Sequence, residues 1–132
     1  MSPFRSAVAL VLLRCPRDGG ALERRAIASI VVHHCATCRG VWLDPGTMAH
    51  LRRDPLLREQ VANDPCAHAP RPARLPDAHR AVRCCECGKA CARRAYAPGT
   101  FFDIDDCAAH GVWMDSGELF AALYPEGLGT LR

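Results

Sequence analysis

The chain has 132 residues, a formal net charge of +3 and 49% hydrophobic residues. This length suits one ordinary domain or two small ones, and each of two small ones would lack the apolar volume for a self-sufficient core. The small net charge does not by itself indicate a nucleic-acid-binding protein. The apolar run at residues 7–13 is far shorter than the roughly 20 residues needed to cross a bilayer, so we expect no membrane association.

The N-terminal segment, residues 1–14, is predicted to be an edge strand or an extension rather than a secretion signal. Its apolar run leads directly into Arg14 and Cys15 with no small-residue cleavage site. The nine cysteines also disfavour a secreted disulfide framework, because their number is odd and most fall in close pairs. Such pairs are typical of metal sites in intracellular chains, so we expect a cytoplasmic protein with reduced thiols.

One unit occurs twice in the sequence. The first copy (residues 15–51) and the second copy (residues 84–123) each contain a paired motif followed by glycine, two short apolar or β-branched runs and a second paired motif. Each then continues with Gly-Val-Trp, an apolar residue, an aspartate and a helical pattern. Agreement of so many elements in one order indicates a tandem repeat.

Each copy predicts a β-hairpin between its paired motifs. The β-branched residues 30–32 favour a strand in the first copy, and the Pro-Gly pair at residues 98–99 favours a turn in the second. In the strand after that turn, Ile104 alternates with Asp103 and Asp105, which predicts one buried and one exposed face.

A helix is predicted at the end of each copy. In the first copy Asp44 caps the helix, Pro45 takes the first helical position, and Pro55 kinks or splits the longer helical pattern. In the second copy Asp115 and Glu118 form a capping box ahead of a short helix.

The two copies are separated by residues 63–83, which contain four prolines and no apolar period and are predicted to be a semi-extended, mobile linker. The predicted organisation is an N-terminal strand or extension (1–14), a first ribbon with a longer helix (15–62), a Pro/Arg-rich linker (63–83), a second ribbon with a short helix (84–124) and a tail (125–132).

The paired motifs have the spacing of a tetrahedral zinc site. Zinc takes four ligands, and two pairs of donors at opposite ends of a hairpin can supply them. Thiolate sulfur and imidazole nitrogen are both good zinc ligands. The second copy therefore predicts a complete site from Cys84, Cys87, Cys107 and His110.

The first copy has an aspartate where the second has a thiolate. Its register gives Cys15, Asp18, Cys35 and Cys38, with Asp18 at the position of Cys87. A carboxylate can complete zinc coordination, although it is unusual beside three thiolates. The fourth position is otherwise filled by water, or by His33, His34 or the linker pair Cys66 and His68.

Three cysteines lie outside these two sets. Cys85 takes the place of Pro16 in the repeat and is expected to be unbound, Cys91 is expected to be a small buried hydrophobe, and Cys66 lies in the linker. No deaminase, phosphate-loop, metalloprotease or serine-hydrolase motif accompanies the zinc pattern. We therefore expect no catalytic residues, no enzymatic activity and no small-molecule substrate.

The segments Gly-Val-Trp-Leu-Asp at residues 40–44 and Gly-Val-Trp-Met-Asp at residues 111–115 each follow a ligand pair and precede a helical pattern. In this they resemble bacterial transcription factor IIB-type zinc-ribbon domain proteins, and the resemblance covers residues 15–51 and 84–123. It implies a small metal-stapled α+β fold with two zinc ribbons, each an antiparallel β-hairpin with a C-terminal helix and one structural zinc. It also implies ligand roles for the six paired-motif cysteines named above and, by position, for His110.

The same place of Trp42 and Trp113 in both copies favours packing of the helix against the ribbon over exposed stacking platforms, and the other aromatic residues are sparse. A basic band offers weak candidates for phosphate binding, although a solvated linker is the favoured interpretation of these residues. These candidates are Arg71, Arg74, Arg80, Arg83, Arg93 and Arg94.

The predicted function is that of a non-catalytic zinc-binding protein whose tandem ribbons contact an unidentified protein or nucleic acid. A link to transcription is implied by the resemblance alone. The alternative is a thiol redox-sensing or metal-handling protein that uses the spare cysteines and a labile first site.

Overall fold

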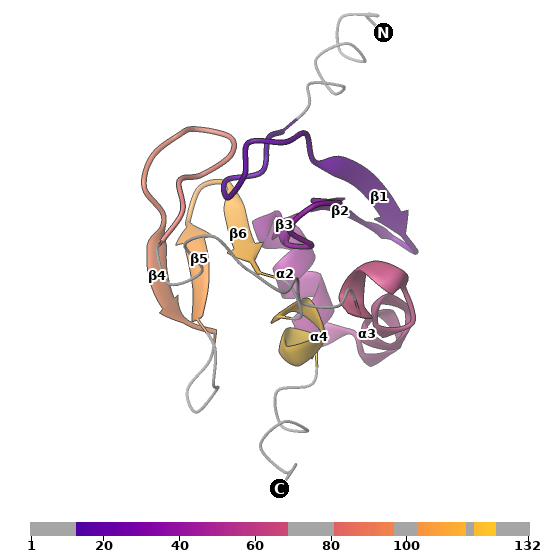
Figure 1. The fold of residues 1–132 in the computed structure, drawn as a ribbon. Helices are drawn as coiled ribbons and strands as arrows, with labels where there is room; N and C mark the ends of the chain where they lie inside the picture. Colours follow the sequence, from indigo (N-terminus) through magenta and orange to yellow (C-terminus); the bar gives the residue numbers. More distant parts are fainter. Residues whose placement is uncertain (1–12, 69–80, 97–102, 116–117, 124–132) are drawn as a thin grey trace, which may run out of the picture.

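The computed structural model describes residues 13–68, 81–96, 103–115 and 118–123. Within these ranges the chain is a small α+β protein whose strands form one antiparallel sheet in the order β1-β2-β3-β6-β5-β4 (Figure 1). The elements are β1 (Glu23–Ile27), β2 (Ile30–His34), β3 (Val41–Leu43), α2 (Pro45–Arg53), α3 (Pro55–Ala62), the 3-10 helix η1 (Pro65–His68), β4 (Ala92–Ala95), β5 (Asp103–Cys107), β6 (Gly111–Met114) and α4 (Glu118–Leu123).

Strands β3 and β6 join the two copies into one sheet. They pair antiparallel with Trp42 directly opposite Trp113. The first copy contributes the three strands on one side of this junction and the second copy contributes the three on the other. Counted outward from the junction, the order is β3-β2-β1 in the first copy and β6-β5-β4 in the second. Because the copies share one sheet, they do not move independently on the linker.

The central strands are buried on both faces, which explains their almost uninterrupted apolar sequence. On one face, apolar side chains of β3 and β6 form a core with the helices, and these are Val41, Leu43, Val112 and Met114. On the other face, Trp42 and Trp113 pack with cysteines of both copies and are completely buried. Neither tryptophan is therefore an exposed stacking platform, and their contacts lie in the cysteine cluster rather than in the helix core.

In the first copy, the helices begin and end where the sequence predicts. The Asp44 carboxylate accepts a hydrogen bond from the Thr47 N–H at 2.7 Å and caps α2. Pro55 splits the longer helical pattern, and Asp54 closes α2 while its carboxylate caps α3. In the second copy, Glu118 accepts a hydrogen bond from the Asp115 N–H at 2.8 Å, as a capping box requires.

Helix α4 of the second copy packs against α3 and η1. The 3-10 helix η1 lies in the stretch predicted to be linker, and its Cys66 is buried in the helix-side core. Residues 1–12 of the predicted N-terminal strand or extension (1–14) lie outside the described residues, and Arg14 forms an isolated antiparallel bridge with Ala21. The predicted Pro-Gly turn at residues 98–99 also lies outside the described residues.

One strand prediction is wrong at Asp105. Ile104 is buried on the helix side and Asp103 is exposed, as the alternation predicts, but Asp105 is 1% exposed. The reason is that Arg17 and Arg93 cover its carboxylate on the opposite face of the sheet. The alternation of polar and apolar residues along one strand cannot predict an ion-pair partner that comes from a distant loop.

Gly40 sets the close approach of the two copies. A Cβ atom at this position would collide with the Trp113 indole ring across the β3–β6 junction. Glycine before Val-Trp is thus required by packing between the copies, because no side chain fits under the ring.

We predict that Gly40→Ala lowers the free energy of unfolding of the zinc-loaded chain by about 1–3 kcal/mol through overpacking at Trp113. Gly46→Ala is the matched control, because its Cβ would meet only the Asp44 carboxylate at an ordinary 3.5 Å and alanine favours a helix. Urea unfolding followed by tryptophan fluorescence measures both. Equal stability of the two variants would contradict this packing role.

Candidate metal centres

The second copy brings four donor atoms together at the ends of β5 and β6 and on the loop before β4. Cys84, Cys87, Cys107 and His110 each offer one ligand atom, and these atoms all lie within 4.8 Å of one another. His110 Nδ1 is 3.7 Å from Cys84 Sγ and 3.6 Å from Cys107 Sγ, and Cys87 Sγ is 4.0 Å from Cys107 Sγ. The two paired motifs therefore converge on one point.

These separations fit a tetrahedral zinc ion. Zn–S bonds of about 2.3 Å and Zn–N bonds of about 2.0–2.1 Å at tetrahedral angles place the donors roughly 3.5–3.8 Å apart. A disulfide would hold two sulfurs at about 2.05 Å, and all nine cysteines are free. Hydrogen bonding to His110 also lowers the pKa of Cys107 to about 7, which favours the thiolate that zinc binds.

The first copy forms the corresponding cluster from Cys15, Asp18, Cys35 and Cys38, again with all donor atoms within 4.8 Å. Cys15 Sγ and Cys38 Sγ are 3.6 Å apart, and Cys35 Sγ is 3.4 Å from Asp18 Oδ2. The three cysteines are buried and Asp18 lies at the exposed edge. A carboxylate oxygen therefore lies beside the three sulfurs, at the place that Cys87 takes in the second copy.

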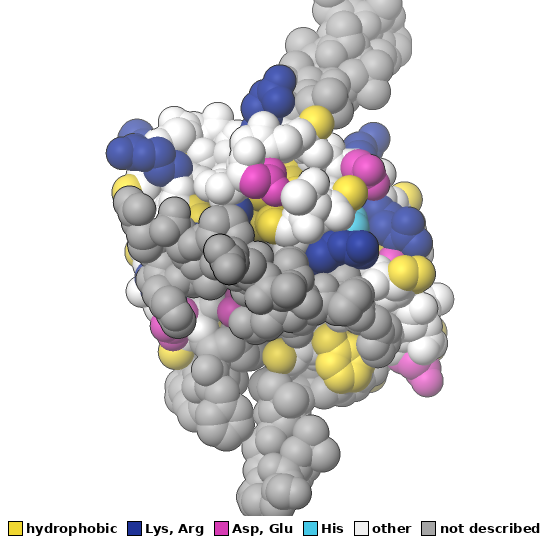
Figure 2. All heavy atoms as spheres, in the orientation of Figure 1, with side chains coloured by type: hydrophobic (Ala, Val, Ile, Leu, Met, Phe, Trp, Pro, Cys, Tyr) yellow, Lys and Arg dark blue, Asp and Glu magenta, His cyan; other side chains and the backbone are white. Residues whose placement is uncertain are grey.

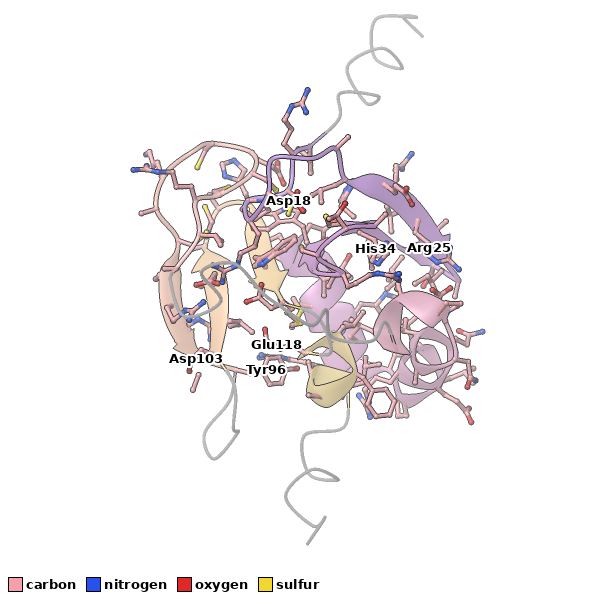
Figure 3. The ribbon with its side chains drawn as sticks, in the orientation of Figure 1. Asp18, Arg25, His34, Tyr96, Asp103 and Glu118 are labelled. Atoms are coloured by element: carbon pink, nitrogen blue, oxygen red, sulfur yellow. The ribbon has the colours of Figure 1, made fainter. Side chains whose placement is uncertain are left out.

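Asp18 is oriented for this role by its own loop, which precedes β1 (Figure 3). Its Oδ1 accepts a hydrogen bond from the Gly20 N–H at 2.9 Å, which turns Oδ2 toward the sulfurs. Burial opposes ionisation of the carboxyl, but the hydrogen bonds from Gly20 and Cys35 outweigh it and lower the pKa of Asp18. The group is therefore an anionic donor at neutral pH.

The same loop geometry holds the first pair in both copies. Gly19 and Gly88 adopt left-handed φ angles of +80° and +78°, which glycine tolerates without strain. The side chains of Arg14 and Arg83 donate to the carbonyl oxygens of these glycines at 3.2 and 3.1 Å. Arg83, a predicted phosphate contact, thus braces a metal-binding loop, and Arg14 does the same in the first copy.

The other predicted donors lie apart from both clusters where the structure describes them. Figure 3 shows His34 on β2, away from the loop that carries Asp18, and His33 precedes it on the same strand. Cys66 lies in the helix-side core, and the His68 side chain is outside the described residues. Asp18 is therefore the fourth donor that the fold supplies to the first cluster.

The three thiols outside the clusters lie in environments that disfavour the thiolate. Burial raises the pKa of each of Cys66, Cys85 and Cys91 to about 12. Reactive cysteines need accessible thiolates, which these environments disfavour. Cys91 is 7% exposed, which agrees with its interpretation as a small buried hydrophobe.

The predicted phosphate-binding arginines are only partly described. Arg93 forms two hydrogen bonds of 3.0 Å with the Asp105 carboxylate, and Arg94 pairs with Asp106 at 3.2 Å. These ion pairs engage the guanidinium groups within the sheet and weaken the phosphate-binding interpretation. The remaining linker candidates, Arg71, Arg74 and Arg80, lie outside the described residues.

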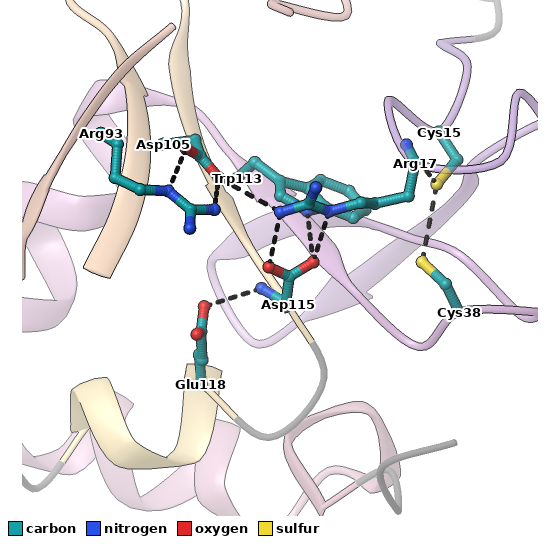
Figure 4. Close-up of polar contacts among 8 residues, drawn as sticks. All are labelled: Cys15, Arg17, Cys38, Arg93, Asp105, Trp113, Asp115 and Glu118. Atoms are coloured by element: carbon teal, nitrogen blue, oxygen red, sulfur yellow. Dashed lines mark hydrogen bonds and ion pairs between the residues drawn. The ribbon is translucent and has the colours of Figure 1, made fainter. Parts of the chain in front are cut away.

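Two residues that sequence reasoning missed occupy the same place in the two metal-binding loops. Arg17 lies between Cys15 and Asp18, and Glu86 lies between Cys84 and Cys87. Arg17 donates two hydrogen bonds to Asp115 of the second copy, at 3.0 and 2.9 Å (Figure 4). Glu86 accepts a hydrogen bond from the Trp42 indole at 3.1 Å. The sequence signal that could have identified them is their opposite charge at the same position of the repeat.

Comparison with known proteins supports the first of these centres. Residues 14–54 match the TFIIB-type zinc-ribbon family model described as transcription factor zinc-finger. The match spans the first cluster and α2, so a zinc ribbon describes the first copy, and it covers less than half of the chain. No curated protein and no solved structure matches the chain. Among the described helices, none combines the length and apolarity that a bilayer crossing demands.

We predict two zinc ions per wild-type chain, and one each for Asp18→Ala and Cys87→Ala. Each substitution removes one corner of one tetrahedron and leaves the other cluster complete. Elemental analysis after gel filtration measures the ratio, and Cys66→Ala is a control that removes a thiol outside both clusters. Two zinc ions retained by Asp18→Ala would mean that the carboxylate is dispensable.

Proposed function

We propose that this protein is a non-catalytic scaffold of tandem zinc ribbons, with one structural zinc in each copy, that serves as an interaction module. The observation that carries the proposal is the pair of clusters with four converging protein donors each. Four protein ligands satisfy tetrahedral zinc and leave no open position for a substrate or a reactive water. Bound zinc would supply folding free energy to a chain with little apolar volume.

A protein is the favoured partner. Base stacking needs accessible aromatic rings, but Trp42 and Trp113 are completely buried. Among the described side chains on the face drawn in Figure 2, both basic and acidic groups are present. The family match over residues 14–54 is the support for a connection with transcription, and it concerns the first copy alone.

Metal handling is the second candidate, and Asp18 is the observation that favours it. A carboxylate is a harder ligand than a thiolate, so the first site would release a soft metal more readily than a four-thiolate site would. A metal-handling protein would lose zinc from the first site at chelator concentrations that leave the second site filled. Equal retention at both sites would exclude this role.

We predict that the zinc-loaded chain shows no measurable binding to labelled mixed-sequence DNA or RNA at low salt, where phosphate contacts are strongest. Fluorescence anisotropy over a salt series measures this. The chelated chain is the control, because an unfolded chain with 17 basic residues can bind polyanions non-specifically. Tight binding by the zinc-loaded chain that weakens steeply with salt would indicate that the partner is a nucleic acid and not a protein.

A further inference from the structure

Arg17 is part of the first metal-binding loop, but its guanidinium group contacts a carboxylate of the second copy. Its backbone N–H lies 3.3 Å from Cys15 Sγ, so its position depends on the conformation of the loop that presents Cys15 and Asp18. Its side chain extends away from this cluster to Asp115, which follows β6 (Figure 4). One residue therefore connects the first cluster to the second copy.

The contact is buried and its charges are balanced. The side chains of Arg17, Asp105 and Asp115 are 5%, 2% and 9% exposed. Arg17 lies 3.7 Å from Asp105, which also pairs with Arg93, so two guanidinium groups face two carboxylates. Asp115 also accepts a hydrogen bond from the Trp113 indole at 3.0 Å, but this neutral donor does not replace the positive charge of Arg17. A buried carboxylate that loses its cation is strongly destabilising.

The second copy makes the reciprocal contact. Glu86, in the loop that presents Cys84 and Cys87, accepts the hydrogen bond of Trp42 on β3. Trp42 and Trp113 are paired across the junction, and each indole N–H donates to a carboxylate. The loop of each cluster thus contacts the other copy, through Trp42 on β3 or through Asp115, the residue that follows β6.

We propose that the two metal sites are coupled, with Arg17 as the positioning residue that transmits the coupling. Metal at the first site fixes the loop, and the loop holds Arg17 between Asp105 and Asp115. This stabilises β5, which ends at Cys107, and β6, which begins directly after His110. Loss of the first metal releases the loop, and the buried carboxylates of Asp105 and Asp115 in the second copy then lose the positive charge of Arg17. By thermodynamic linkage the second metal must favour the first by the same factor.

This proposal rests on zinc binding at both clusters but not on the identity of a partner. The test measures the zinc dissociation constant of the second site by competition with a chromophoric chelator, with and without Cys38→Ser to disable the first site. Three full-length chains are compared: wild type, Arg17→Gln and Arg24→Gln. Arg24 is the control, because it is an exposed arginine on β1 of the same copy and lies outside both metal-binding loops.

In the wild-type chain and in Arg24→Gln, disabling the first site should weaken zinc binding at the second by about 5- to 150-fold, the usual range of coupling between sites. In Arg17→Gln the second site should already be weakened, and Cys38→Ser should add little. A second-site constant that changes less than about twofold in the wild-type chain, or full coupling in Arg17→Gln, would overturn the proposal.

Arg17→Lys guards against misfolding of the glutamine variant. Lysine keeps the charge but cannot form the two-bond fork with Asp115, so part of the coupling should be lost. Unchanged coupling in this variant would also count against Arg17. If the wild-type chain binds no zinc at either site, the proposed function itself fails, and that outcome is visible before any variant is made.

Discussion

The pairing of β3 with β6 is the interaction on which the rest of the structure depends. It places Trp42 opposite Trp113, turns two three-stranded units into one sheet and creates two faces that can both be covered. The helices of both copies share one face, and the two candidate metal-binding clusters lie with the tryptophans on the other. Without this junction, each copy would expose a central strand whose residues are apolar on both sides.

The metal-binding loops contribute to this junction as well as to their own clusters. Arg17 and Glu86 occupy equivalent places, and each reaches the other copy's central strand or the residue that follows it. The two loops carry opposite charges at this position, and their partners differ accordingly. Arg17 contacts two carboxylates, and Glu86 accepts a hydrogen bond from an indole N–H. The two copies thus differ in charge at one repeat position, and each residue at that position contacts the other copy.

Much of the local structure is predictable from the sequence, because it depends on residues close together in the chain. The hairpin of the first copy, the cap at Asp44, the helix break at Pro55 and the composition of both donor clusters belong to this group. Local periodicity, proline chemistry and ligand spacing determine these features.

The connection between the copies could not be predicted in this way. Arg17 and Asp115 are 98 positions apart, and an arginine beside a cysteine gives no indication of a carboxylate in another unit. The burial of Asp105 and the packing of Trp113 over Gly40 have the same origin. Each depends on which strands become neighbours, and a repeat predicts similar units without fixing how they pair.

The most direct test of a single metal-stapled sheet is cleavage between the copies. A specific protease site placed within residues 69–80 allows the zinc-loaded chain to be cut after folding, and native mass spectrometry then shows whether the halves stay together. The junction, the α4 contacts and the Arg17 ion pairs predict one zinc-loaded complex with the mass of the intact chain plus one water. Two separate folded fragments, each with its own zinc, would contradict it.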